Sequence, residues 1–260
     1  MNHIVSENSN LEKKKKHLPR LVEFLIVILI ICVLLLLLYP AVQQAREIAK
    51  YKSPSRRHLK YLGLAISNFD YVQTENSSWE RPVDSSGAPL HSWMTDLLPY
   101  IDESAMAAEI DYSQAWDTSE NKNVFTITIP KFFNPDLSDV PHQNVQGYGL
   151  SHYSANSHLI PFNKTRNLTT VKMHDGQSNT LLIGEIDSSF PAWGDPTNLR
   201  DPIRGLKGGP NAYGRPGGEG VFFLFADGSV HLLNKDTDPA VLKALSTPAG
   251  GETFPLQQAR

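Results

Sequence analysis

The sequence has a single cysteine and none of the short motifs that accompany common catalytic sites. Cys32 lies within a long apolar run, so the rest of the chain has no disulfide and no thiol for metal binding or catalysis. No G-x-S-x-G turn, H-E-x-x-H helix, phosphate-binding glycine loop or dinucleotide-binding glycine motif occurs. These absences predict a protein that is not an enzyme and that carries no cofactor.

The chain also lacks a strong charge of either sign, since its formal net charge is -3. Its basic residues gather around the apolar run, so nothing indicates a nucleic-acid partner. Lys13 to Lys16 directly before the run is typical of a topology signal. Basic residues are as dense after the run as before it, so the flanks alone leave the orientation open.

What the sequence does contain is an apolar run from Leu21 to Tyr39, LVEFLIVILIICVLLLLLY, in which Glu23 is the only charge. At about 1.5 Å of rise per residue, a helix of this length spans the hydrocarbon core of a bilayer. Helix-like sequence follows in place of a small-residue cleavage site, so we expect a permanent anchor and not a signal peptide. Glu23 is either a functional group within the membrane or a carboxylate that reaches the headgroups near Arg20.

Beyond the span, apolar residues recur at three- and four-residue intervals, which predicts a helix that leaves the membrane and packs on the head. Pro54, preceded by Ser53, suits the first position of a new helix better than a helix interior. The predicted organisation is a basic tail over 1–20, a transmembrane segment over 21–39, a stalk helix over 40–69 with a break near 53–54, and an extracytoplasmic head over 70–260.

The head has more strand signals than helix signals, so we expect an α+β fold with a mostly antiparallel, β-rich head. Three short helices are predicted, over 93–100, over 102–109, and over 239–245 with Asp238 as its cap. Four strands are predicted, over 124–129, 181–183, 221–225 and 230–233. Asp227 and Gly228 predict a two-residue hairpin turn with positive φ angles between the last two strands.

Other polar residues have structural interpretations that we prefer. The stretch 187–220 is rich in Gly, Pro, Asn and Asp and predicts a long surface loop, in which Trp193, Tyr213 and Arg215 form a candidate binding surface. Asp236 and Asp238 could contribute to a calcium site, but Asp238 is better explained as a helix cap. Four histidines lack the spacing of metal ligands and are expected to be solvated or locally bonded: His142, His152, His158 and His174. No metal site is predicted.

A series of sequence blocks occurs in a fixed order along nearly the whole chain. The blocks are LLLLLYPAVQQAREIAK at 34–50, HLKYLGLAISNFDYV at 58–72, LLPYIDE at 97–103, DGQSNTLLIGE at 175–185, FADGSVHLL at 225–233 and LKALSTPAGGE at 242–252. In this order they resemble the pilin-like proteins of domain of unknown function 1559. The resemblance implies an architecture like type IV pilins and type II secretion pseudopilins, with a long N-terminal helix and a β-rich extracytoplasmic head.

The chain departs from this family at the prepilin cleavage region. A site of the form G-F-T-L-x-E is usual there, whereas this chain has Leu18 and Pro19 where the peptidase needs a small residue and a flexible bond. We therefore expect the leader to be retained. The resemblance gives Glu23 a role in assembly, because the matching pilin glutamate pairs with the N-terminal amine of a neighbouring subunit. An uncleaved chain has no amine at that place.

Two further departures concern the head. The family tends to have one cysteine before its N-L-K-Q-L-G block and another in an F-x-C-P segment, whereas this chain has Ser55 and Asn134 at the matching places. The paired loss fits one missing disulfide. The histidine that the family has upstream of its D-G pair is also absent, with Arg215 or Gly217 near its place, so no role of that histidine carries over.

Three functions remain open from the sequence. The first is a non-catalytic single-pass protein of the inner (cytoplasmic) membrane, N-terminus in the cytoplasm, whose head serves assembly or display. Its partners would be the membrane, other pilin-like subunits or secretion-system components. The second is an anchored binding module for a glycan or surface protein, favoured if the aromatic residues of 187–220 are exposed. The third, an anchored hydrolase, lacks a nameable nucleophile and base.

Overall fold

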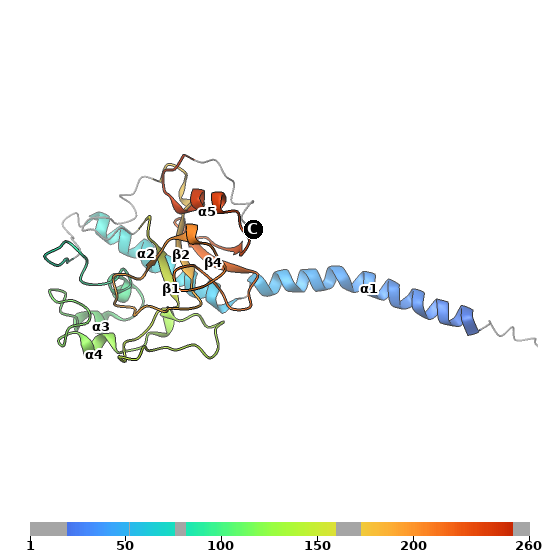
Figure 1. The fold of residues 1–260 in the computed structure, drawn as a ribbon, viewed down its shortest axis with the longest axis horizontal. Helices are drawn as coiled ribbons and strands as arrows, with labels where there is room; N and C mark the ends of the chain where they lie inside the picture. The colour runs from blue at the N-terminus through green and yellow to red at the C-terminus, as the bar shows by residue number, and fades with distance from the viewer. Residues whose placement is uncertain (1–19, 52, 76–81, 160–172, 252–260) are drawn as a thin grey trace, which may run out of the picture. The chain divides into compact units, whose positions relative to one another are not determined.

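The protein is described from a computed structural model, which covers residues 20–51, 53–75, 82–159 and 173–251. The chain divides into two compact units, Met1–Tyr51 and Lys52–Arg260. The first unit consists, within the described residues, of one helix. The second is the head, which contains a sheet and all the other helices (Figure 1).

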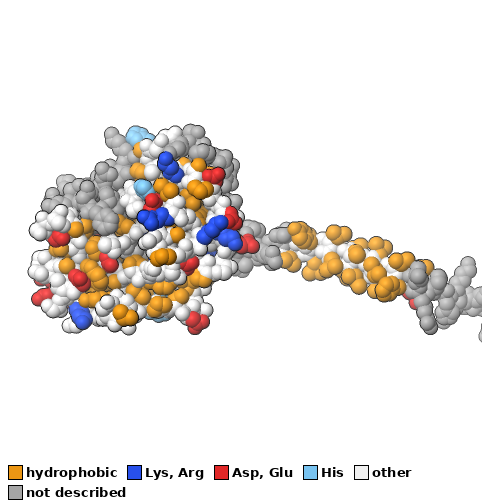
Figure 2. Space-filling model, viewed as in Figure 1, with side chains coloured by type: hydrophobic (Ala, Val, Ile, Leu, Met, Phe, Trp, Pro, Cys, Tyr) orange, Lys and Arg blue, Asp and Glu red, His pale blue; other side chains and the backbone are white. Residues whose placement is uncertain are grey.

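The helix of the first unit, α1, extends over Arg20–Tyr51 and passes through Pro40. Figure 2 shows hydrophobic side chains over its visible face. Within α1, Val22–Pro40 is long and apolar enough to cross a membrane, and it is the one such stretch among the described residues. By length and composition, this stretch fits either a membrane anchor or a signal sequence.

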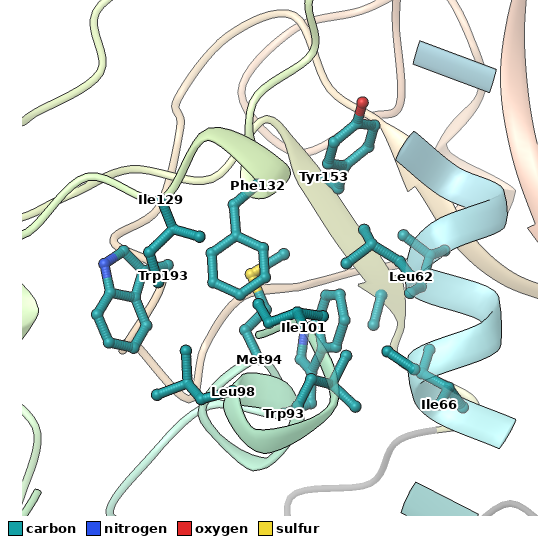
Figure 3. Packing of buried hydrophobic residues seen from close by; sticks show 14 of the residues in the cluster. Leu62, Ile66, Trp93, Met94, Leu98, Ile101, Ile129, Phe132, Tyr153 and Trp193 are labelled. Carbon is teal, nitrogen blue, oxygen red and sulfur yellow. The ribbon is translucent and has the colours of Figure 1, made fainter. Parts of the chain in front are cut away.

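The head begins with helix α2, Pro54–Glu75, whose first residue is the proline that the sequence favours as a helix start. Its apolar stripe is buried, with Leu59 and Leu62 both 0% exposed. The stripe contacts β4 and the 3-10 helix η1, Thr95–Tyr100. Figure 3 shows Leu62 and Ile66 of α2 facing the residues around η1. The amphipathic pattern of α2 therefore makes this helix one wall of the core of the head.

The head contains a five-stranded sheet with the strand order β3-β1-β2-β4-β5. The strands are β1 Tyr153–Asn156, β2 Leu181–Glu185, β3 Leu199–Arg200, β4 Gly220–Phe225 and β5 Val230–Asn234. Only the β1–β3 pair is parallel, and the other pairs are antiparallel. The fold is thus α+β with a mostly antiparallel sheet, as predicted.

Both faces of the sheet are buried, because alternate residues of β4 point into two separate apolar clusters. Phe222 and Leu224 join the larger cluster with α2. Phe223 and Phe225 join a second cluster that includes three residues of α5, Pro239–Ser246. Helix α5 begins as predicted, with Asp238 Oδ1 accepting from the Ala240 N–H at 2.7 Å. Every residue of β4 is consequently buried.

The β4–β5 hairpin is present, but its turn differs from the two-residue turn that the sequence predicted. The loop has three residues, Ala226, Asp227 and Gly228, because the Phe225 N–H donates to the Ser229 carbonyl at 2.8 Å. Only Gly228 has positive φ, at 79°. A type I turn followed by a left-handed glycine is the usual three-residue hairpin, and it accommodates Asp227 without strain. Asp227 accepts the Ser229 N–H at 2.8 Å.

The predicted strand over 124–129 is wrong. Residues Lys122–Phe125 form the short helix α4, and its preceding residue Asn121 is fully buried. The Asn121 side chain donates to three carbonyls of the loop before it and accepts the Asp111 N–H at 2.9 Å. Within the run, the Phe125 carbonyl accepts the Gly149 N–H and the Ile127 carbonyl accepts Trp193 Nε1–H, both at 2.9 Å, so tertiary contacts overrode the β propensity of the run. The other predicted helices exist as η1 and as α3, Ser104–Ala108.

The stretch 187–220 is not simply a surface loop. It contains β3 and the 3-10 helix η5, Pro202–Arg204, and it buries Trp193 and Tyr213 completely. The buried guanidinium of Arg200 donates to the carbonyls of Ser188, Ser189, Gly209 and Ala212. Arg200 therefore links Ser188 and Ser189 to Gly209 and Ala212 by hydrogen bonds, within a segment whose composition predicted an irregular loop. The aromatic residues of this segment belong to the core and not to an exposed rim.

Candidate functional site

The largest group of buried polar side chains in the described part of the head surrounds the carboxylate of Glu185. Glu185 is the last residue of β2 and is 0% exposed. Its Oε1 accepts hydrogen bonds from Ser55 Oγ and, at 2.9 Å, from Asn134 Nδ2. Its Oε2 accepts from the Phe222 N–H on the neighbouring strand at 2.8 Å. Three donors from three distant segments therefore satisfy one buried carboxylate.

Secondary structure brings these donors together. Ser55 is the second residue of α2, and Asn134 lies just beyond the 3-10 helix η2, Pro130–Phe132. Tyr153 of β1 lies beside them, with its hydroxyl 3.1 Å from Ser55 Oγ. The backbone N–H of Asp136 donates to Asn134 Oδ1 at 2.9 Å, so the Asn134 amide is bonded at both its oxygen and its nitrogen.

An ion pair lies next to this carboxylate. Arg215 Nη2 is 2.7 Å from Asp136 Oδ2, and the same Asp136 oxygen accepts from Ser53 Oγ. The Arg215 guanidinium also lies over the Phe222 ring, 5.2 Å from its centroid. Ser53 and Ser55 are thus both held by acidic side chains of the head. The start of α2 is bound at two successive polar contacts.

Electrostatics in this group are set mainly by exclusion of water. Burial raises the pKa of the Glu185 carboxyl, while the positive charge of Arg215 and the bonds from Ser55 and Phe222 act in the opposite direction. Burial and the neighbouring Glu185 raise the pKa of the Tyr153 hydroxyl well above its ordinary value. The group therefore contains the Tyr153 hydroxyl, the Asn134 amide and the Glu185 carboxyl, all buried from solvent. The pKa is raised for the hydroxyl and for the carboxyl.

His152 adjoins the same group and is held as a neutral ring. Its Nδ1 accepts the Asn134 backbone N–H at 3.1 Å, which leaves Nε2 to donate to the Pro141 carbonyl at 3.1 Å. Burial lowers the pKa of His152 to about 4, and the neighbouring His142 acts in the same direction. A protonated His152 could not accept from Asn134. This histidine is a structural acceptor.

Most of the remaining polar residues singled out from the sequence have local partners, and His174 is exposed. His158 Nε2 lies 2.9 Å from Asp201 Oδ1, and Asp236 pairs with Lys207 at 2.8 Å. The ring of His142 stacks on Phe133 at a centroid distance of 4.0 Å. No group of three or more metal-ligating side chains exists among the described residues. Asp236 and Asp238 are therefore not part of a cluster of candidate calcium ligands among the described residues.

The other predicted site residues lie in the apolar helix α1, before it in the sequence, and in the β4–β5 hairpin. Glu23 lies in the first turn of α1 and is exposed in this unit, whereas Leu18 and Pro19 lie outside the described residues. Asp227 and Gly228 form the hairpin loop and take part in no cluster of polar side chains among those described.

Sequence reasoning assigned no role to Glu185, although its block was noted. The available signal was a glutamate at the end of an apolar strand, LLIGE, where a charge needs a partner. Ser55 and Asn134 were singled out only as the positions of a missing disulfide. Both side chains bond to one oxygen of Glu185, so these two positions are close in space.

The architecture defines a class of protein: an α+β head preceded by one apolar helix, compatible with a membrane-anchored surface protein. Residues 43–206 match the sequence model of a family described as a protein of unknown function (DUF1559). The chain belongs to that family. No curated protein and no solved structure matches the chain.

Proposed function

We propose that this protein is a non-catalytic, single-pass protein of the inner membrane, with its head outside the cytoplasm for assembly or display as a pilin-like or pseudopilin-like subunit. One observation carries the proposal. The apolar helix α1 ends at Tyr51, and α2 begins at Pro54 as part of the core of the head. Only two residues separate the two helices in the sequence, so the proposed anchor directly precedes the first helix of the head.

The polar contacts at the start of α2 support this role. Ser53 is bonded to Asp136, and Ser55 is bonded to Glu185 and Tyr153. These contacts hold the first turn of α2, which directly follows the proposed anchor in the sequence, on the core of the head, as a subunit in an ordered assembly requires.

The described residues add no support for the other two functions. A binding module was favoured by exposed aromatic residues in 187–220, but Trp193 and Tyr213 are 0% exposed. A hydrolase needs polar side chains open to a substrate, but Ser55 and Glu185 are both 0% exposed. The orientation, with the N-terminus in the cytoplasm, is supported by the lysine cluster before the span.

In this proposal, Glu23 pairs with a polar group of a neighbouring subunit within the membrane. A charge in hydrocarbon costs several kcal/mol unless it is paired or lies near the interface. The span has no other charged residue, and we assign the partner to a neighbouring subunit; a carboxylate that reaches the headgroups near Arg20 is the alternative.

Cys32 provides a direct test, because it is the only cysteine of the chain and lies in the span. Copper-phenanthroline oxidation of native membranes should give disulfide-linked dimers of the natural chain. The Cys32→Ser variant should give none. Glu23→Leu should lower the dimer yield by about fivefold, the ratio expected for ~1 kcal/mol of interhelical bonding, while Phe24→Leu serves as the matched control. Monomers alone, with the thiol consumed, would count against assembly.

Protease protection tests the orientation. Protease added to intact spheroplasts should digest the head and leave a membrane-embedded stub that carries the N-terminus. A tag at the N-terminus should become accessible only after lysis. Full protection of the head in intact spheroplasts would reverse the orientation.

A further inference from the structure

The bonds around Glu185 bring a hydroxyl and a side-chain amide to the same carboxylate oxygen. Ser55 Oγ and Asn134 Nδ2 both donate to Glu185 Oε1, the second at 2.9 Å. We propose that Ser55 and Asn134 form an intramolecular ester cross-link, with Glu185 as the proton carrier and ammonia as the leaving group. This is a modification site, and it does not depend on the function proposed above.

The reaction balances with the groups that are present. Glu185 takes the proton of Ser55 Oγ as this oxygen attacks Cγ of Asn134. The carbonyl π electrons move onto Oδ1 and form a tetrahedral intermediate. When they return, the Cγ–Nδ2 bond breaks, and Glu185 delivers its proton to the departing nitrogen. The products are an ester between Oγ and Cγ, one molecule of ammonia and the original carboxylate, with no oxidant or reductant.

The surroundings of Asn134 favour attack at its side chain. The Asp136 N–H donates to Asn134 Oδ1 at 2.9 Å, which is where negative charge develops in the intermediate. The following residue, Pro135, has no backbone N–H. The common side reaction, in which the next backbone nitrogen attacks the asparagine carbonyl to form a succinimide, is therefore closed at this position. The hydroxyl of Ser55, bonded to the same Glu185 oxygen as the Asn134 amide, is the nucleophile.

Burial suits both the formation and the survival of such an ester. Ser55 and Glu185 are 0% exposed, and Asn134 is 1% exposed, so hydrolysing water is excluded. Exclusion of water also raises the pKa of Glu185, which makes it a better base for the hydroxyl proton. Once the ammonia has left the site, the reverse attack of ammonia on the ester is no longer available.

The cross-link would join the first turn of α2 to the segment after η2. Ser55 lies four residues beyond the end of α1, so a covalent bond here would fasten the head at the point where its anchor enters. Tension on the anchor would then act on a covalent bond in addition to hydrogen bonds.

Peptide mass spectrometry of the full chain, extracted from membranes in detergent, tests the proposal. Trypsin releases Ser53–Arg56, SPSR, and a second peptide that begins at Phe132 and contains Asn134. We expect these two peptides as one species, about 17 Da lighter than their sum because one ammonia is lost. Hydroxylamine, which cleaves esters and leaves amides intact under mild conditions, should separate them.

Two serines in the same peptide provide a matched control. Ser55→Ala should abolish the linked species, whereas Ser53→Ala should retain it, because Ser53 bonds to Asp136 and not to Glu185. Recovery of the two natural peptides unlinked and at their unmodified masses would overturn the proposal, and this measurement needs no variant to fold. A linked species that persists in Ser55→Ala would overturn the assignment to Ser55.

Discussion

The two units of this protein each place a glutamate among apolar residues, and they treat it differently. Glu23 lies in an apolar helix, where it is exposed, and its surroundings can be read from the adjacent sequence. Glu185 is buried and bonded by donors from α2, β4 and the segment after η2. The comparison shows that a buried glutamate can link segments of the fold when hydrogen-bond donors come from distant parts of the chain. The location of Glu23 in an apolar stretch is, in contrast, set by its neighbours in the sequence.

Removing the carboxylate of Glu185 should have the largest effect. Glu185→Ala leaves the Asn134 amide and the Phe222 N–H without their acceptor in a site closed to water, which costs about 3–5 kcal/mol. Glu23→Ala should leave the unfolding of the head unchanged. Thermal unfolding of the full chain in detergent, followed by circular dichroism, compares the two. Equal unfolding midpoints for the natural chain and Glu185→Ala would show that the buried carboxylate does not stabilise the head.

Acid should weaken the head through His152, the neighbour of this carboxylate. The pKa of His152 is about 4 in the folded head against an ordinary value of 6.5, so the unfolded chain binds the proton first. Stability is therefore complete above pH 6.5 and falls by up to about 3 kcal/mol between pH 6.5 and 4. Denaturant titrations across this range measure the loss.

The raised pKa of Glu185 has the opposite sign, because protonation of a buried carboxyl favours the folded state as the pH falls. The His152→Gln variant should not lose stability as the pH falls from 6.5 to 4, and it should still gain the stability that protonation of Glu185 gives. A loss of the same size in His152→Gln would assign the effect to other groups. His174→Gln is the control, because His174 is exposed and is not among the groups that shift the pKa of His152.

A backbone change at the β4–β5 hairpin should have an intermediate effect. Gly228 has φ of 79° with open space around its Cα, so Gly228→Val introduces backbone strain without a clash and costs about 1–3 kcal/mol. Asp227→Asn should be tolerated, because asparagine can accept the same Ser229 N–H. Thermal unfolding of both variants tests the pair. An unchanged midpoint for Gly228→Val would show that this turn does not limit the stability of the head.

The smallest expected effect concerns the N-terminus. Because Leu18 and Pro19 replace the residues that a prepilin peptidase recognises, we expect no change in mass when the protein is produced with that peptidase. N-terminal sequencing of the membrane-extracted chain checks this. A methylated N-terminus at Pro19 would contradict the expectation and would give the neighbouring subunit an amine for Glu23.

Local pattern sufficed where an element is decided by residues near in sequence. The helix α5 follows from the Asp238 cap and Pro239, and the strands β2, β4 and β5 follow from their apolar runs. The hairpin was predicted, but its loop length was not, because Asp-Gly composition fits both two- and three-residue turns. The short strands β1 and β3 were missed, since neither has a long apolar run.

The sequence by itself determined the apolar span, the buried stripe of α2 and the family to which the chain belongs, because each depends on residues within one segment or on their order. Only the tertiary structure decided that 124–129 is not a strand, that Trp193 and Tyr213 are core residues, and that Ser55 and Asn134 meet at Glu185. The physical reason is that burial and hydrogen-bond partners are properties of contacts between distant segments. A side chain's own neighbours in the chain do not specify them.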